Sequence, residues 1–438
     1  MITYGINMIV RKRLIDVPYF ILGALLVYFL GTHSANINYD TPTYINFDPT
    51  RPPVYPIFVW MFRWAGPCQY SLIMWVQGIF LFVTLLYARY WLKKNLYMLD
   101  FAIFLVFFVT MITISFHYQI SYIQSEGLTF PFFILTFFLL IECFQKFNLK
   151  KIFYLALLVN LLVLTRLQFY YFYVIFIILC TWYLWWRLPI KKLSITILIL
   201  FGSMMFTIIA DHSYHYFKHG SFAGGSYGGL MILVQALYLA DNNAASYFKD
   251  ANEKNYIQVM IDQRNAKTLN QNASLIITLR PSYLNDAYKT YATNYLSLLA
   301  IIESTLEPGV KNKMGKKSIY KTNAIATNLS KIIISREYKK NLVFLLWKFV
   351  ECTGGIPLFL FFLMLLISIP YKIIKDGIRS PDVSLLFVTI MTIIIFCNAA
   401  MIALCNPDLP PYFCYSQFLF YCLAGFLVNE TLFRNKKL

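Results

Sequence analysis

The chain is dominated by long apolar runs with short polar connections between them, and not by the periodic apolar stripes of soluble helices. A helix of about 18 or more apolar residues is long enough to cross a bilayer, because each residue adds about 1.5 Å. The pattern therefore predicts an all-α polytopic membrane protein with about ten transmembrane helices. The predicted spans are 17–32, 69–91, 98–116, 127–144, 152–165, 168–186, 193–210, 353–372, 383–403 and 412–431.

The basic residues between the runs give an independent test of this span count. Cytoplasmic connections of membrane proteins are enriched in Lys and Arg. Every second predicted connection is basic, which places both termini in the cytoplasm. The basic connections are 11–13, 93–94, 146–151, 187–192, 372–379 and 434–437.

Two long polar connections then fall on the outer side, 33–68 and 211–352. They divide the chain into an N-terminal transmembrane module (1–210), an outer region (211–352) and C-terminal transmembrane helices (353–438). The outer region is long enough to fold by itself or to lie on the membrane as amphipathic helices. Its excess of Lys and Arg suits anionic headgroups or a phosphorylated substrate. Segment 331–352 mixes bulky apolar residues with Lys and Arg, which predicts an interfacial helix before the next span.

Composition excludes the soluble globular class and a nucleic-acid partner. Of 438 residues, 59% are hydrophobic and only 13% are charged, whereas soluble proteins contain about 25% charged residues. The net charge of +18 is carried by short clusters between apolar runs, which orient the chain among membrane lipids and do not form a nucleic-acid surface. The eight cysteines include no CxxC pair, so a zinc site is not supported.

The first outer loop, 33–68, gathers Asp40, Tyr44, Asp48 and Arg51 where the chain leaves the bilayer. A carboxylate such as Asp40 can serve as a general base if it reaches an acceptor hydroxyl. A purely local role is the alternative, in which Asp40 caps a short helix and Asp48-Pro49 forms a turn. Composition and spacing leave both interpretations open.

The sequence Asp40-Thr41-Pro42-Thr43-Tyr44, followed by Arg51-Pro52-Pro53-Val54-Tyr55-Pro56, resembles the GT-C superfamily of membrane glycosyltransferases. The similarity is to a bacterial branch related to the protein O-mannosyltransferases and the lipid A aminoarabinose transferases. It implies a GT-C-type helical bundle with Asp40 as the essential acidic residue. It also implies that the Arg51 motif begins an amphipathic helix along the membrane. This motif alone is specific, and the resemblance otherwise covers only the hydropathy of the chain.

Two further segments fit this resemblance. Gln124-Ser125-Glu126-Gly127-Leu128 is similar to the family's Ser/Thr-Glu-x-Leu signature, which implies that Glu126 faces the same cavity as Asp40. An ordinary acidic residue at a helix N-terminus is the alternative. Between 407 and 412, where relatives often have Arg-Tyr, this chain has no arginine, and the role of that segment stays open.

Arg166 follows the fifth predicted span, in the sequence Thr165-Arg166-Leu167-Gln168. This sequence resembles a Thr-Arg-Pro-Glu step of the family, although Leu167 and Gln168 replace the proline and the glutamate. An arginine at membrane depth is costly and is a functional candidate by default. Its fork of donors suits the phosphate of a sugar donor. A structural ion pair with Glu126 is the alternative.

Three histidines, His212, His215 and His219, have a spacing that places them near one face of a helix. Such a face is a weak candidate for a divalent metal, and an interfacial helix without metal explains the same spacing. No other cofactor is predicted. The following Gly-rich segment, 220–229, lacks the Lys-Ser/Thr of a phosphate loop and is interpreted as a connector over the mouth of the site.

The resemblance implies an integral protein of a bacterial inner membrane. It would be a glycosyltransferase that moves a sugar, with inversion, from a polyprenyl-phosphate carrier to an acceptor on the periplasmic face. The acceptor is lipopolysaccharide or another surface glycan, a lipid or a protein. A polysaccharide polymerase or ligase is an alternative, and such enzymes rely on Arg and His of the outer loops. A lipid or polysaccharide transporter without catalysis is a second alternative. Transport is disfavoured because the polar candidates are confined to the outer mouth and no internal repeat is evident.

Overall fold

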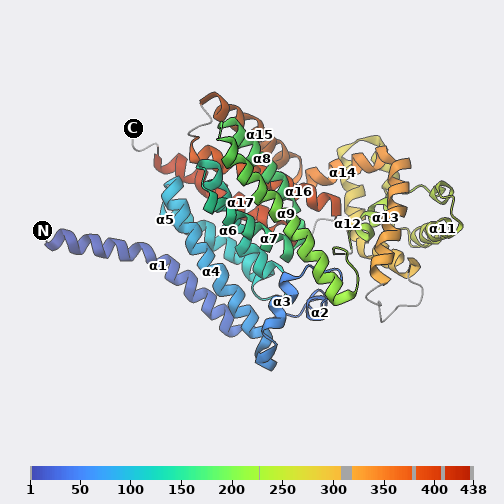
Figure 1. Cartoon of the computed structure of the whole chain (residues 1–438), viewed down its shortest axis with the longest axis horizontal. Coiled ribbons are helices and arrows are strands. Elements are labelled where there is room, and N and C mark those ends of the chain that lie inside the picture. Colours follow the sequence, from blue (N-terminus) through green and yellow to red (C-terminus); the bar gives the residue numbers. More distant parts are fainter. Residues whose placement is uncertain (1, 226, 307–317, 377–380, 406–409, 435–438) are drawn as a thin grey trace.

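The computed structural model describes residues 2–225, 227–306, 318–376, 381–405 and 410–434 (Figure 1). Within these ranges the regular elements are helices, and the extended backbone forms one isolated bridge, between Asn36 and Tyr122. The predicted all-α class is therefore confirmed for the described residues. Figure 1 shows a large helical bundle and, beside it, a second lobe made of α10 to α14.

The bundle combines helices from both ends of the chain around one apolar core. In it α16 packs against α6, and α17 packs against α5. The N-terminal part of α1 extends away from the bundle (Figure 1). The bundle helices are α1 (Ile2–Thr32), α4 (Gln69–Leu96), α5 (Asp100–Thr110) with its π-helical continuation η2 (Met111–Gln119), α6 (Glu126–Gln145), α7 (Leu149–Thr165), α8 (Tyr171–Trp185), α9 (Ile190–His219), α15 (Gly355–Asp376), α16 (Val383–Cys405) and α17 (Pro410–Asn429), which η6 (Glu430–Arg434) follows.

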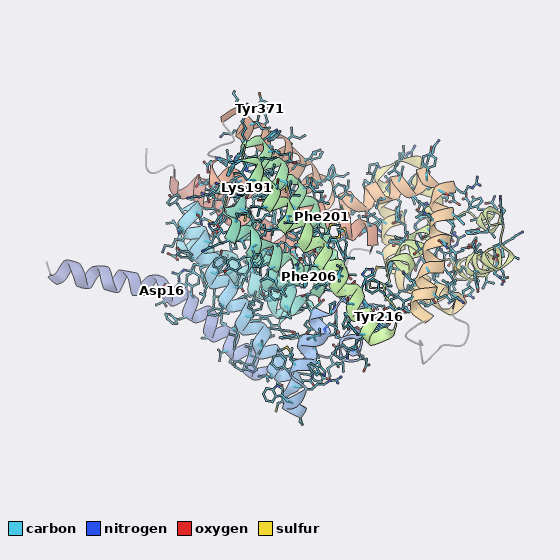
Figure 2. The ribbon with its side chains drawn as sticks, viewed as in Figure 1. Asp16, Lys191, Phe201, Phe206, Tyr216 and Tyr371 are labelled. Atoms are coloured by element: carbon cyan, nitrogen blue, oxygen red, sulfur yellow. The ribbon has the colours of Figure 1, made fainter. Side chains whose placement is uncertain are left out.

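Exposed apolar side chains identify the bundle as membrane-embedded. Figure 2 shows Phe201, Phe206 and Tyr216 spaced along α9, and they are 58%, 57% and 55% exposed. Contiguous apolar surface of this extent is not stable in water. Among the described residues, six helical segments are long and apolar enough to cross a membrane: Arg63–Leu96, Glu126–Gln145, Leu167–Trp185, Ile190–His219, Gly355–Lys375 and Val383–Leu404.

The predicted count of about ten spans is therefore supported for six of them. The predicted spans 17–32, 98–116, 152–165 and 412–431 correspond to helices outside this set. For example, α7 has only 17 residues, and the apolar helix at Asp100–Phe116 includes a change from α- to π-helical hydrogen bonding. The count of ten stays a prediction.

The helix that contains the seventh predicted span continues beyond the predicted end of that span at 210. The apolar run ends there, but no helix-breaking residue follows until Gly220, where the backbone is left-handed with φ 70°. Asp211 and the three histidines therefore lie in the last turns of α9, which ends at His219.

The second lobe has a hydrophobic core of its own, formed by residues between 230 and 344. Arg264 is fully buried in this lobe, and its Nη1 donates to the carbonyl oxygens of Leu237 at 2.7 Å and Ala240 at 2.6 Å. It thereby satisfies carbonyl groups that the end of α10 leaves unpaired. The lobe contains α10 (Gly228–Leu239), η4 (Ala244–Tyr247), α11 (Ala251–Ala266), η5 (Ala273–Thr278), α12 (Pro281–Leu306), α13 (Ser318–Arg336) and α14 (Tyr338–Cys352).

The predicted interfacial helix 331–352 is divided into α13 and α14 at Glu337. Glu337 is buried, and its Oε1 accepts hydrogen bonds from Asp241 N at 3.0 Å and Tyr247 OH at 3.1 Å. These tertiary contacts hold the break, which no local pattern signals. Along α14, Tyr338, Leu342 and Leu346 form an exposed stripe with a spacing of four residues, just before the candidate span in α15. Such a stripe suits a membrane interface.

The first outer loop folds against the segment that leads into α6. Asn36 N donates to Ser121 O at 2.7 Å, Ile123 N donates to Asn36 O at 3.2 Å, and Thr41 Oγ1 donates to Ile123 O at 3.0 Å. These bonds bring the loop to the N-terminus of α6, where Glu126 begins the helix. The loop contains α2 (Thr41–Ile45), α3 (Val54–Met61) and η1 (Arg63–Cys68).

Candidate functional site

The polar side chains selected from the sequence meet in one place, which we call the Arg166 cluster. Asp40, Tyr44 and Arg51 come from the first outer loop, whereas Ser125 and Glu126 come from the start of α6. Arg166 comes from the turn between α7 and η3 (Leu167–Tyr170), and Tyr412 from the start of α17. The cluster is the set Asp40, Tyr44, Arg51, Ser125, Glu126, Arg166 and Tyr412.

Asp40 occupies the N-cap position of α2, but its side chain does not cap the helix. Asn38 caps instead, because its Oδ1 accepts from the backbone N–H groups of Asp40 and Thr41, both at 3.0 Å. The Asp40 carboxylate is therefore not needed as a cap, and its Oδ1 accepts a hydrogen bond from Arg51 Nη2. Its Oδ2 has no hydrogen-bond partner among the described residues, and the side chain is 41% exposed. The capping alternative is wrong, and one carboxylate oxygen is open.

Arg51 fixes the position of Asp40. Its Nε donates to Thr43 Oγ1 at 2.8 Å, its Nη1 donates to Tyr44 OH at 3.3 Å, and its Nη2 donates to Asp40. Every guanidinium nitrogen therefore has an acceptor. Burial lowers the pKa of Arg51, but Tyr44, Asp40 and Tyr412 together raise that pKa above its ordinary value. Arg51 is thus permanently charged and fully committed to the loop.

Arg166 and Glu126 form a buried ion pair. The backbone of Arg166 is extended (φ −155°, ψ 116°) at the end of α7, which turns the side chain toward α6. Its Nη1 donates to Glu126 Oε1 and to Ser125 Oγ, and the side chains are 12% and 5% exposed. The pairing alternative for Arg166 is therefore present. Nε and Nη2 donate to no acceptor among the described residues, so part of the donor fork stays available.

Two hydroxyl groups connect the Asp40 pair to the Arg166 pair. Tyr44 OH accepts from Arg51 and donates to Ser125 Oγ at 3.2 Å. Ser125 Oγ in turn donates to Glu126 Oε2 at 3.2 Å. Burial raises the pKa of Tyr44 above its ordinary value, so this hydroxyl keeps its proton. The polar chain from Asp40 to Arg166 is therefore continuous.

Tyr412 is a member of the cluster whose role the sequence left open. The guanidinium carbon of Arg166 lies 4.1 Å from the centroid of its ring, a cation–π distance. Its backbone oxygen accepts from Gln168 Nε2 at 3.3 Å and Asn398 Nδ2 at 3.1 Å. Of the segment 407–412 singled out from the sequence, residues 407–409 lie outside the described residues.

Asp48 has a local role in the structure. Its Oδ1 accepts from the backbone N of Thr50 at 2.9 Å and from Thr50 Oγ1 at 2.6 Å. This is the turn that the Asp-Pro sequence favours. The backbone oxygen of Asp48 accepts from Arg51 N at 3.0 Å, but no described hydrogen bond joins the Asp48 side chain to the Arg166 cluster.

The three histidines do not form one imidazole face. His212 Nδ1 bonds to its own helix at Ile208 O (2.8 Å), and its ring packs against Phe222. His215 and His219 are buried, with ring centroids 5.4 Å apart. The described residues contain no group of three His, Cys, Asp or Glu side chains that is arranged to hold a metal ion. The weak metal prediction is wrong for this set because His212 turns back to its own backbone.

The cluster as a whole contains two arginines and two carboxylates, and each ion pair keeps an open group. Asp40 Oδ2 is able to accept a proton, whereas Arg166 Nε and Nη2 are able to donate to an anion such as a phosphate. Comparisons with protein-family models, with curated protein sequences and with solved structures found no match to this chain.

Proposed function

We propose that this protein is an inverting membrane glycosyltransferase of the GT-C type. It moves a sugar from a polyprenyl-phosphate carrier to a surface glycan, on the outer face of a bacterial inner membrane. The observation that supports this proposal best is the continuous polar chain from Asp40 through Arg51, Tyr44 and Ser125 to Arg166. A carboxylate with an open oxygen and a guanidinium with open donors thus belong to one network, as acceptor activation and phosphate recognition require.

The proposed roles follow from these open groups. Asp40 takes the proton from the acceptor hydroxyl as that oxygen attacks the anomeric carbon, and the bond from that carbon to the carrier phosphate breaks. Arg166 donates through Nε and Nη2 to the phosphate, which gains negative charge as it leaves. Arg51 holds Asp40, and Glu126 offsets the charge of Arg166 when no phosphate is bound.

Mass spectrometry of surface glycans from cells with and without this protein tests the proposal. The expected result is the loss of one sugar residue from the glycans of the deleted strain. Asp40→Asn should not restore that residue, because loss of a general base slows transfer by about 10²–10⁴-fold. Asp16→Asn is the matched control, since Asp16 also pairs with an arginine but lies outside the cluster. It should restore the residue fully.

Two other outcomes favour the alternatives. If Asp40→Asn restores the glycan fully and Arg or His substitutions within 211–352 abolish it, the protein is a polysaccharide polymerase or ligase. If deletion blocks export and no glycan bond depends on the protein, it is a transporter without catalysis.

A further inference from the structure

Asp211, near the end of α9, is a buried carboxylate outside the Arg166 cluster and is 1% exposed. Its Oδ2 accepts from Gly225 N at 3.3 Å, and its Oδ1 lies 3.4 Å from His215 Nε2. A buried carboxylate is costly unless it is partnered. The hydrogen bond from Gly225 therefore ties the connector to the end of α9, and the second contact places His215 against the same carboxylate.

His215 joins Asp211 to the second lobe. The imidazole is fully buried, and its Nδ1 lies 2.9 Å from the hydroxyl of Tyr320 in α13. A single chain of contacts thus runs from Gly225 through Asp211 and His215 to Tyr320.

The Gly-rich connector, residues 220–225, lies against the sequence neighbours of both arginines of the Arg166 cluster. A Cβ on Gly225 would stand 3.0 Å from Leu167 Cδ1 and 3.7 Å from Thr50 O. Leu167 directly follows Arg166, and Thr50 directly precedes Arg51. A Cβ on Gly224 would stand 3.0 Å from Asp211 Oδ2. The connector therefore packs closely between the first outer loop, the Arg166 turn and the end of α9.

We propose that Asp211 and His215 are positioning residues, which hold the connector 220–225 against the edge of the Arg166 cluster and couple it to the second lobe through Tyr320. The proposal rests on the glycosyltransferase function for its consequence, because the wall that they hold borders the residues that meet the donor and the acceptor. A small displacement of such a wall lowers the transfer rate without removing any catalytic group.

Hydrogen exchange of the full-length protein in nanodiscs tests the positioning directly. In Asp211→Ala the amides of 221–225 should exchange about tenfold faster than in the wild type, because the Gly225 amide loses a charged acceptor. Asp211→Asn keeps an oxygen for that amide and should restore most of the protection. Tyr320→Phe removes one hydroxyl only, and it should speed exchange at the connector about two- to fivefold.

A glycine pair provides the activity test. Gly225→Val presses on Leu167, whereas Gly228→Val enters open space at the start of α10, where no atom lies within 4 Å. In the glycan assay Gly225→Val and Asp211→Ala should each lower the rate of sugar addition about tenfold or more, and Gly228→Val should leave it unchanged. Asp211→Asn should recover part of that rate.

The outcomes separate this inference from the proposed function. Unchanged exchange at 221–225 in Asp211→Ala overturns the positioning, whatever the activity. Faster exchange with a full transfer rate shows a contact without consequence and also overturns it. A wild-type protein that adds no sugar refutes the proposed function, while the exchange result still decides whether Asp211 holds the connector.

Discussion

Two clusters of the same charge composition lie near opposite ends of α4. The arrangement of their charges differs, and this difference suits one cluster to hold helices together and the other to bind a substrate. The Arg89 cluster consists of Asp16, Tyr19, Arg89, Lys93 and Asp100, whereas the Arg166 cluster was defined above. Each contains two cations, two carboxylates and at least one tyrosine. In both, an arginine lies over a tyrosine ring, at 3.8 Å for Arg89 and Tyr19 and at 4.1 Å for Arg166 and Tyr412.

The arrangement of the charges is what differs. In the Arg89 cluster both cations share one carboxylate, because Asp100 Oδ1 accepts from Arg89 Nε at 2.8 Å and Asp100 Oδ2 pairs with Lys93. Asp16 and Lys93 are about half exposed, at 51% and 50%. In the Arg166 cluster the two ion pairs are separate, and neutral hydroxyls connect them. Arg89 pairs with Asp16 of α1 and Asp100 of α5 and thereby braces three helices, whereas the separated pairs leave one ion of each pair, Asp40 and Arg166, with an open side for a ligand.

The largest expected difference concerns removal of a carboxylate from each cluster. Glu126→Gln leaves the charge of Arg166 buried without its counter-ion, so we expect a loss of about 3–5 kcal/mol in the free energy of unfolding. Asp16→Asn, at a half-exposed pair, should cost less than about 1 kcal/mol. Thermal unfolding in detergent measures both.

Undecaprenyl phosphate then tests whether Arg166 accepts the phosphate of a carrier. A ligand that supplies the missing negative charge should raise the Tm of Glu126→Gln by more than it raises the Tm of the wild type. An equal shift of Tm in the two proteins would mean that the carrier phosphate does not contact Arg166. The Arg166 cluster would then have no assigned role in binding the carrier.

A smaller effect on carrier binding is expected when residue 166 keeps its positive charge and loses only the several donors of the guanidinium group. Arg166→Lys retains the pair with Glu126 but offers a single ammonium in place of Nε and Nη2. Loss of one charge-assisted hydrogen bond should raise the Kd for undecaprenyl phosphate about tenfold, with little change in Tm. Arg89→Lys is the matched control and should leave that Kd unchanged. If both variants bind the carrier like the wild type, the open donors of Arg166 are not a phosphate site.

Most helices were predictable from the sequence because a membrane forces each span to satisfy its own backbone within one apolar run. The end of α9 was not, since the helix continues past Ala210 through polar residues until Gly220. The break between α13 and α14 at Glu337 was equally unpredictable, because its contacts with Asp241 and Tyr247 join segments about ninety residues apart in the chain. Hydropathy reports burial in lipid and not such tertiary contacts.

The candidate site was predictable only where a motif existed. Asp40, Arg51, Glu126 and Arg166 were each singled out, and the structure brings them into one cluster. No motif marks Asn38, although it caps α2 in place of Asp40, because its role depends on where the Asp40 side chain pairs. Ser125 was quoted only as part of a motif, although it links the two ion pairs. Tyr412 reaches Arg166 from the other end of the chain, and no spacing rule covers such a distance.

The smallest expected effect on sugar addition belongs to Arg89, and it completes the comparison. Arg89→Ala leaves Asp100 paired with Lys93 and Asp16 half exposed, so we expect a loss of about 1 kcal/mol in the free energy of unfolding. Sugar addition should be unchanged in the glycan assay, because no member of this cluster belongs to the Arg166 network. High salt should reduce the part of the stability difference that comes from Asp16, since that carboxylate is half exposed and reached by ions. A large loss of transfer at unchanged stability would place chemistry at this end of α4 as well, and the assignment of roles to the two clusters would then be wrong.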